Sequence, residues 1–377
     1  GWKEWDLMAQ EAFRVVLMRG GSSRALFFRS EDLPRGIEDQ DRIFLAALGC
    51  PDRTGRQVDG LGGSASSNNK VAIISPSNDP DVDVNFTFAQ LSPDHGAVDR
   101  SGSCGNISAA VGAYAVEEQM VLTAPGVTLV RIRNTNSDKI VIAHVPNPDG
   151  QFQPEGSFAI AGVLGSGARI DLEFIDPAGS AGRGLLPTGR PRDVLLGADF
   201  AVSCSLVDAG KPGVLVPFAE LGLEPNVDPK AVDADQELLN RIEAVRALAA
   251  VKMGLVPVPP AAGTTAPAVP QLTFFARGGE GSIRALGISM GKAHRTLPLT
   301  AAICLTAAAS TPGSLVSEAL GEMRALDQPL KLSHPAGEIE TTLSLQTEEK
   351  VSEIRSVSVA RTARRILEGT VFVARGD

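Results

Sequence analysis

The sequence predicts an α+β protein of two like-built lobes, each a mostly antiparallel sheet wrapped around a helix. Its 377 residues exceed one average domain, and 39 Gly with 25 Pro indicate many turns between short strands. A strand, turn and strand occur in "RVVLMRGGSSRALFF" (14–28) and again in "SCSLVDAGKPGVLVP" (203–217). We therefore expect an internal duplication, with an N-terminal lobe at 12–190 and a C-terminal lobe at 191–377.

The two segments align in a single register, which supports the duplication. The matched pairs are Leu17 with Leu206, Gly21 with Gly210, and Leu26 with Leu215. Each half also carries a cysteine beside an alanine-rich run, "CGNISAAVG" at Cys104 and "CLTAAASTPG" at Cys304. We expect each of these cysteines to open a short helix.

Hydrophobic periodicity places the other elements in order along the chain. Helices are expected in "DRIFLAALGCPD", in "NISAAVGAYAVEE" despite its central glycine, and in "QELLNRIEAVRALAAVKMG". Strands are expected in "VAII", "DVDVNFTFAQLS", "LTFFAR" and "IRALGISM", a hairpin in "TLVRIRNTNSDKIVIAHVP", and two final strands in "IRSVSVARTARRILEGTVFV". The Gly- and Pro-rich stretch 170–193 has no helical period and is interpreted as the crossover between halves, and 257–271 as a loop.

Composition excludes several classes of partner. A net charge of −9 with one Tyr and two Trp is unlike a nucleic-acid-binding protein, which needs a basic face and stacking rings. No apolar run is long enough to span a bilayer, and the N-terminus lacks the apolar core of a signal peptide. We expect a cytoplasmic protein with no membrane partner, and a homo-oligomer such as a dimer is possible.

Neither a metal nor an organic cofactor is expected. The four cysteines and four histidines are scattered, without a CxxC pair or any ligand spacing typical of zinc, and a disulfide framework is not expected either. The stretch "GLGG" lacks the GxGxxG spacing, and the sequence has no GxxxxGK[ST] or GxSxG motif.

Cys104 is the first candidate catalytic residue. Glycines at 102 and 105 leave its thiol uncrowded, and the helix that follows offers unpaired N–H groups and a positive dipole end. Such a position favours a thiolate or binds an anion, whereas most free cysteines are simply small buried hydrophobes. For Cys304, core packing is the preferred interpretation.

Lys70 is the second candidate. It follows "GGSASSNN", a loop able to place N–H and OH donors around a ligand, and it directly precedes a strand. A lysine partly desolvated beside such a loop could act as a base near neutral pH, although most lysines at strand ends are simply solvated.

Two glycine-containing loops are candidates for anion binding. Arg19, Ser22 and Ser23 lie in the first turn, and "MGKAHRT" offers Lys292, His294 and Arg295 before the Cys304 segment. Each of these residues could equally be an ordinary solvent-exposed side chain, but two loops with similar placement in a duplicated chain favour a shared site.

Six ordered motifs then resemble one known family. "LMRGGSSRALFF", "DGLGGSASSNNKVAI", "CGNISAAVGAYAVEE", "FIDPAGSAGRGLLPTG", "SMGKAHRTLPLTAAI" and "HPAGEI" are similar to the PrpF-type isomerases, which share the diaminopimelate epimerase fold. The resemblance extends from about residue 14 to residue 373, and "HRTLPLT" is most like the 4-oxalomesaconate isomerases and tautomerases of aromatic-acid degradation. Asn68-Asn69 and Ser22-Ser23-Arg24-Ala25 depart from the Thr-Ser and Thr-Ser-Lys-Gly of many members, which leaves the substrate open.

The resemblance implies a cofactor-independent 1,3-allylic isomerase with its active site between two pseudo-symmetric lobes. Lys70 and Cys104 would share the proton transfers, and their order is left open. The residues expected to bind a small polycarboxylate are Arg19, Ser22, Ser23, Ser67, Asn68, Ser103, Gly105, Asn106, Met290, His294 and Arg295. The alternatives are isomerisation of 2-methylaconitate or methylitaconate, a non-catalytic polycarboxylate-binding protein, and a covalent thiol hydrolase.

Overall fold

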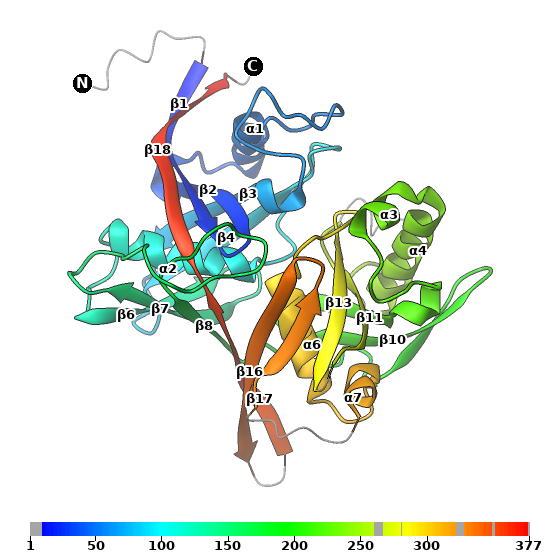
Figure 1. The fold of residues 1–377 in the computed structure, drawn as a ribbon. Helices are drawn as coiled ribbons and strands as arrows, with labels where there is room; N and C mark the ends of the chain where they lie inside the picture. Colours follow the sequence, from blue (N-terminus) through cyan, green and yellow to red (C-terminus); the bar gives the residue numbers. More distant parts are fainter. Residues whose placement is uncertain (1–9, 260–266, 280, 322–327, 349–350, 376–377) are drawn as a thin grey trace, which may run out of the picture.

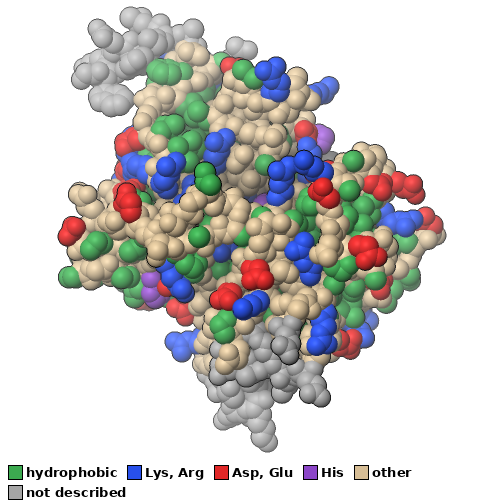
Figure 2. Space-filling model, in the orientation of Figure 1, with side chains coloured by type: hydrophobic (Ala, Val, Ile, Leu, Met, Phe, Trp, Pro, Cys, Tyr) green, Lys and Arg blue, Asp and Glu red, His purple; other side chains and the backbone are tan. Residues whose placement is uncertain are grey.

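The computed structural model describes residues 10–259, 267–279, 281–321, 328–348 and 351–375. Figure 1 shows two groups of strands beside each other, one containing α2 and the other containing α6. No described helix combines the length and the apolar character that crossing a membrane requires. On the face drawn in Figure 2, basic and acidic side chains are interspersed among apolar and neutral ones.

The first half of the chain forms two α-helices and a series of strands. Its elements are β1 (Gln10–Gly20), β2 (Ser23–Arg29), η2 (Ser30–Asp32), α1 (Ile37–Leu48), η3 (Ser66–Asn68), β3 (Lys70–Pro76), β4 (Val84–Leu91), β5 (Val98–Asp99), α2 (Gly105–Glu117), β6 (Gly126–Asn134), β7 (Lys139–Asn147) and β8 (Ile170–Ile175). The predicted helices and hairpins of this half are confirmed.

The second half contains more helix. Its described elements are β9 (Asp193–Leu196), β10 (Ala201–Asp208), β11 (Pro212–Pro217), η4 (Phe218–Leu221), α3 (Pro229–Ala234), α4 (Gln236–Lys252), β12 (Gln271–Arg277), β13 (Ser282–Ser289), β14 (Lys292–Ala293), α6 (Leu299–Ala309), α7 (Leu315–Leu320), β15 (Leu330–His334), β16 (Gly337–Glu348), β17 (Val351–Arg361) and β18 (Ala363–Ala374).

Strand pairing repeats between the halves. In the first half β1 pairs with β2, β2 with β3, β3 with β4, β4 with β6, β6 with β7, and β7 with β8. In the second half β10 pairs with β11, β11 with β12, β12 with β13, β13 with β15, β15 with β16, and β16 with β17. The second and fourth pairings are parallel in both series and the others antiparallel, which confirms the duplication that the two aligned hairpins predict.

The last two strands join the two series. β17 pairs with β16 on one edge and with β8 on the other, and after Thr362 the chain continues as β18, which pairs with β1. The strands around α2 therefore form a ring that the C-terminal strand closes, and Figure 1 shows β18 running along β1. The division of the chain into lobes at residue 190 stays a prediction.

Helices α2 and α6 fill the centres of the two groups of strands. Every residue of α2 from Gly105 to Val116 is buried, as is every residue of α6 from Leu299 to Ala308. Helices that are apolar all round belong in such positions. Gly112 is needed inside α2 because a Cβ there would lie 2.7 Å from the Cβ of Ala143.

The N-termini of these two helices meet where the lobes join. A Cβ on Gly105 would lie 3.2 Å from the Cβ of Leu299, the first residue of α6. The prediction that Cys304 opens its helix is wrong, because α6 begins five residues earlier, after Pro298. Pro298 provides no side-chain cap, so the sequence before α6 lacks the usual polar marker of a helix start.

Two predicted irregular stretches, 170–193 and 257–271, differ from the structure or lie partly outside its described residues. The crossover interpretation of 170–193 is wrong at its start, because Ile170–Ile175 is strand β8 with alternating buried residues. The remainder of that stretch is irregular apart from the first residue of β9. Part of the predicted loop at 257–271 lies outside the described residues.

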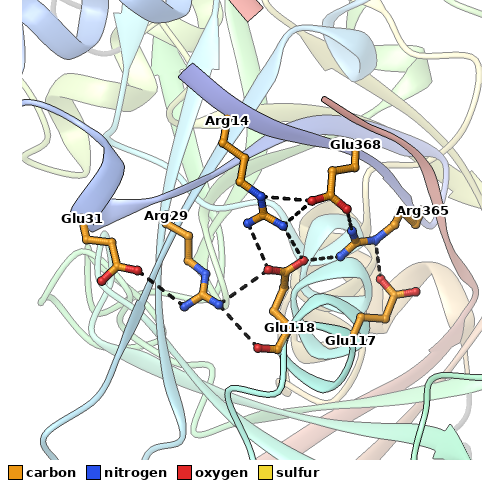
Figure 3. A network of polar contacts seen from close by, with 7 residues as sticks. All are labelled: Arg14, Arg29, Glu31, Glu117, Glu118, Arg365 and Glu368. Atoms are coloured by element: carbon orange, nitrogen blue, oxygen red, sulfur yellow. Dashed lines mark hydrogen bonds and ion pairs between the residues drawn. The ribbon is translucent and has the colours of Figure 1, made fainter. Parts of the chain in front are cut away.

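The C-terminal end of α2 is fixed by ion pairs, drawn in Figure 3. Glu117 and the C-cap residue Glu118 place negative charge where the helix dipole is already negative. Arg14 pairs with Glu118 at 3.0 Å, Arg365 pairs with it at 2.5 Å, and Arg29 lies 3.6 Å away. These arginines come from β1, β18 and β2, so the network joins α2 to the strands around it.

Candidate active site

Lys70 begins β3 and faces Gln90 of β4. Its Nζ donates a hydrogen bond to Gln90 Oε1 at 2.8 Å and lies 5.2 Å from the ring centroid of Phe88. Gln90 Nε2 donates to the backbone oxygens of Ser66 and Asn69, at 3.0 and 2.9 Å. Since the amide nitrogen is occupied by these backbone acceptors, the amide oxygen is left to hold the lysine amine. Lys70 is 8% exposed, so it is not an ordinary solvated lysine.

The loop before Lys70 is organised by Asn69, a fully buried residue. Its Nδ2 donates to Ala65 O at 3.0 Å and to Gly63 O, and its Oδ1 accepts from Gln57 Nε2 at 2.5 Å. The predicted binding residues Ser67 and Asn68 are half-buried in η3 of this loop. Sequence reasoning named these two and missed Asn69, which holds the loop's shape.

Cys104 is the N-cap residue of α2, as the sequence predicts. Its backbone is extended, the residue is 9% exposed, and the free N–H groups of the first helical turn follow it. The neighbouring Ser103 Oγ donates to Gly210 O at 2.8 Å, which ties the segment to the β10–β11 turn of the second half. Asp99 fixes the start of the segment by accepting from Ser101 N at 2.7 Å.

The β1–β2 turn packs against the start of α2. Gly21 has a left-handed φ of 52°, and a Cβ there would collide with Asn106 Oδ1. This close approach brings Ser22 Oγ to 3.4 Å from Asn106 Nδ2 and 3.2 Å from Thr296 Oγ1. The turn therefore touches both the Cys104 helix and the other half of the chain.

The other residues predicted in this turn have different surroundings. Arg19 Nη1 donates to Gly21 O at 2.9 Å and to Thr362 O at 3.1 Å, so the guanidinium stabilises the turn itself. Burial lowers the pKa of Arg19, and the nearby Arg364 lowers it further. Ser23 is buried as the first residue of β2.

His294 lies just before α6. Its Nδ1 contacts the backbone oxygen of Thr296 and lies 3.1 Å from Thr296 Oγ1. Burial lowers the pKa of His294 to about 4, and the positive charge of Lys70 adds to this effect. The imidazole is therefore neutral at pH 7 and close enough to Lys70 to sense its charge.

The two other predicted residues of this segment are Arg295 and Met290. Arg295 is exposed. Met290 has a left-handed φ of 51° and lines a cavity of about 20 Å³ together with Glu243 and Arg246 of α4.

A chain of hydrogen bonds crosses the junction of the two halves. Arg361 Nε donates to Asn106 Oδ1 at 2.8 Å, and Asn106 Nδ2 donates to Ser22 Oγ at 3.4 Å. Ser22 continues to Thr296 and Thr296 to His294. Sequence reasoning missed Arg361, Thr296 and Gln90. The sequence does contain one signal for Gln90, because it is a polar residue within the buried end of β4.

These contacts assemble most of the predicted residues around the start of α2. Ser22, Ser103, Gly105, Asn106 and His294 lie at the junction with Cys104, with Lys70 within electrostatic range. A buried amine and a thiol at a helix N-terminus can exchange protons with a bound carbon acid, and the helix N–H groups can hold an oxyanion. Within the described ranges, no three His, Cys, Asp or Glu side chains group as a metal site.

Comparison with known proteins supports an enzymatic assignment. The model of the PrpF protein family matches residues 10–374. The chain is 35% identical to 3-methylitaconate isomerase of Eubacterium barkeri, covering 96% of this chain and 97% of that protein. It is also 35% identical to 4-oxalomesaconate tautomerase of Pseudomonas putida KT2440, covering 98% of each.

Solved structures confirm the fold. The crystal structure of methylitaconate-delta-isomerase matches with a TM-score of 0.75 and 34% identity, covering 97% of both chains. A hydroxyproline epimerase from Agrobacterium vitis matches with a TM-score of 0.58 at 15% identity, covering 99% of this chain and 94% of that one. The predicted α+β, diaminopimelate epimerase-like fold is thereby confirmed.

Proposed function

Because this chain belongs to the PrpF family and is an isomerase, we propose that it catalyses a cofactor-independent 1,3-allylic shift in an unsaturated polycarboxylate. The observation that carries the proposal is the placement of Lys70 and Cys104. One is a buried amine held by a single side-chain oxygen, and the other is a thiol at the N-terminus of a buried helix. Both lie within electrostatic range of Lys211, at the junction of the halves.

In the proposed reaction, a proton leaves a carbon activated by conjugation to a carbonyl group and carboxylates. The electron pair of the broken C–H bond enters the conjugated system and gives a dienolate, and a proton returns to the carbon two positions away. Lys70 and Cys104 act as base and acid, so after one turnover the base carries the proton taken from the substrate and the acid has given one up. A proton transfer between the two groups, directly or through solvent, then restores the starting state. The order in which the two act is not assigned.

Fixed donors at the start of α2 support the developing charge. The N–H groups of Gly105 and Asn106, with the hydroxyl of Ser22, are suited to hold carboxylate or enolate oxygens in place of water. The hydroxyl of Ser103 donates to Gly210 O and would join them only by exchanging that acceptor for the substrate. A donor of this kind contributes about 3 kcal/mol to a transition state. His294 and Arg295 are proposed to contact a second carboxylate from the other half.

The preferred substrate is 4-oxalomesaconate, on the strength of the "HRTLPLT" segment. Relatives named for methylitaconate and 2-methylaconitate are almost equally similar, at 35% and 33% identity, so overall identity does not discriminate among these compounds. All three are unsaturated polycarboxylates, and the same residues would serve each.

The test is solvent exchange during turnover. The purified enzyme is incubated in D2O with 4-oxalomesaconate, methylitaconate or 2-methylaconitate, and NMR follows deuterium at the allylic carbons. Lys70→Met and Cys104→Ser should lose turnover, whereas Lys331→Met and Cys204→Ala, which lie outside the site, should retain it. Full exchange and turnover in both site variants would refute the assignment of Lys70 and Cys104.

The same experiment separates the other function classes. A non-catalytic polycarboxylate-binding protein would be thermally stabilised by these compounds without any deuterium uptake. A covalent thiol hydrolase would instead leave an acyl group on Cys104 that mass spectrometry detects.

A further inference from the structure

Lys211 is a buried lysine that the proposed chemistry does not use. It lies in the β10–β11 turn, just after Gly210, and is 9% exposed. A Cβ on Gly102 would lie 3.1 Å from Lys211 Cε and 3.2 Å from its Nζ, so the amine reaches the segment immediately before Cys104. Among the described residues, none accepts a hydrogen bond or forms an ion pair with this amine.

The turn that carries Lys211 is held in place by contacts from α6 and from Pro177. The thiol of Cys304, inside α6, donates to Lys211 O at 3.0 Å and lies 3.2 Å from Ala209 O. Gly210 is left-handed, with a φ of 70°, and its nitrogen donates to Pro177 O at 2.7 Å. The lysine backbone therefore has a fixed position while its amine remains without a hydrogen-bonding partner in the described structure.

The duplication explains why this position matters. The register that aligns Gly21 with Gly210 aligns Ser22 with Lys211. Ser22 contacts Thr296, two residues before the N-cap of α6, and Lys211 reaches Gly102, two residues before the N-cap of α2. Each turn thus reaches across to the segment that precedes the opposite central helix. Lys211 is the counterpart, in the second half, of a residue already placed at the site.

The charged and titratable groups around Lys211 come from several elements. Burial lowers the pKa of Lys211 to about 8, with Asp99 of β5 raising it, Lys70 lowering it, and the thiols of Cys104 and Cys304 raising it. Asp208, on its own hairpin, is engaged by Ser180 Oγ and by Ala181 N. Val269 packs near Gly102, and its backbone oxygen accepts a hydrogen bond from Arg246. Arg246 also forms an ion pair with Glu243.

We propose that Lys211 is a substrate-binding residue whose ammonium pairs with a carboxylate of the substrate beside Cys104. This inference rests on the proposed function, and it specifies how the second half of the chain takes part in it. The geometry supports a binding role, because the amine has no acceptor of its own and lies beside a thiol and a helix N-terminus that are suited to an anion. An arriving carboxylate supplies the missing acceptor.

The test uses tricarballylate, a saturated tricarboxylate that has no allylic proton to transfer. Calorimetry measures its affinity for the wild type, Lys211→Met, Lys211→Arg and the exposed-lysine control Lys331→Met between pH 7 and 9.5. At pH 7, Lys211→Met should bind about 10- to 100-fold more weakly, as expected for the loss of one charge-assisted hydrogen bond. The control should match the wild type.

The pH dependence separates a charge from a merely structural role. A pKa of about 8 means that the free enzyme loses the Lys211 proton above that pH, so wild-type affinity should fall about 30-fold by pH 9.5. Lys211→Arg stays charged and should show a much smaller fall, whereas Lys211→Met should bind weakly throughout. Because Lys70 is retained in both variants, it contributes equally to the two profiles and cannot account for the difference.

Several results would overturn the assignment. Unchanged affinity in Lys211→Met would do so, as would a pH profile shared by the wild type and Lys211→Arg, or an absence of tricarballylate binding to the wild type. With 4-oxalomesaconate, the expected effect of Lys211→Met is on KM, and a loss confined to kcat would assign a proton-transfer role instead. If the wild type binds tricarballylate through Lys211 but isomerises nothing, the proposed function fails while the binding role stands.

Discussion

Arg361 Nε donates a 2.8 Å hydrogen bond to Asn106 Oδ1, so a strand near the C-terminus holds the first turn of the Cys104 helix. Arg361 is 5% exposed, and no described carboxylate forms an ion pair with its guanidinium. Burial lowers the pKa of Arg361 to about 10, which means that its charge disfavours the folded state. Its contribution is to orient Asn106 and, through it, Ser22.

Replacing Arg361 by methionine should therefore separate activity from stability. Arg361→Met removes a buried charge that lacks a paired carboxylate, so the free energy of unfolding should be unchanged within about 1 kcal/mol, or higher. Because the hydrogen-bond chain to Ser22 and Thr296 is broken, kcat/KM should fall by about tenfold or more. Urea denaturation and steady-state kinetics test both parts, with the exposed Arg241→Met as control. A large loss of stability would contradict this account.

Glu118 should be important for stability. Burial alone would raise the pKa of Glu118, but hydrogen bonds from Arg14 and Arg365 outweigh this and lower it. Glu118→Gln removes the carboxylate that Arg14, Arg29 and Arg365 share, while Glu368 still pairs with Arg14 and Arg365, and should lower the free energy of unfolding by about 2 kcal/mol at pH 7. The difference should shrink as the pH falls, since the wild-type carboxylate then becomes protonated.

The matched control is Glu31→Gln. Glu31 is 72% exposed and lies 4.0 Å from Arg29, at the edge of the same network. Its replacement should change the free energy of unfolding by well under about 1 kcal/mol. Equal effects of the two substitutions would show that burial of the Glu118 pairs is unimportant.

Stability should fall with acidification between pH 6.5 and 4. Burial lowers the pKa of His294 to about 4, with a further contribution from Lys70, and burial likewise lowers the pKa of His334 to about 4, with Arg361 adding to it. In this window the unfolded chain binds protons that the folded chain does not, so each histidine destabilises the fold by up to about 3 kcal/mol by pH 4.

Urea denaturation at several pH values measures this effect. His334→Gln should show a shallower loss of stability from pH 6.5 to 4 than the wild type, whereas His95→Gln, at an exposed position, should follow the wild type. Parallel stability curves for His334→Gln and the wild type would show that protonation of His334 does not cause the loss of stability in acid.

Cys104 should be the most reactive of the four thiols. Burial raises the pKa of Cys50 to about 11, of Cys204 to about 12 and of Cys304 to about 12, and Cys104 alone lies at a helix N-terminus. Iodoacetamide at pH 8, followed by peptide mass spectrometry, should label Cys104 at least about tenfold faster than the others. Cys50 is the decisive comparison, since both residues are 9% exposed. Equal labelling of the two would exclude an activating effect of the helix.

Local sequence patterns were sufficient to predict the hairpins and three of the four longer described helices, α1, α2 and α4. The alignment of Gly21 with Gly210 also predicts the repeat, because the two turns need the same left-handed glycine. The start of α6 could not be predicted in this way. Pro298 gives that helix no polar cap, and the run after it is apolar on every side.

The site was predictable only where a residue belongs to a distinctive segment. Lys70 and Cys104 each follow a stretch of small or polar residues that suggests a ligand loop. Gln90, Thr296 and Arg361 are isolated polar residues whose importance comes from strand pairing and from contacts between distant segments. The alignment of the two repeats places Lys211 at the position of Ser22. This alignment indicates a binding role for Lys211 only once the contacts of Ser22 are known from the structure.

The closure of the first ring by β18 has a consequence for how the protein acquires its structure. Residues 10–20 pair with residues 363–374, so the ring around α2 has very high contact order and cannot be completed until nearly all of the chain has been synthesised. The strands from β9 to β16 need no such distant partner and can assemble earlier during translation. The half that supplies Lys211 thus becomes a preformed surface on which the half that supplies Lys70 and Cys104 finishes folding.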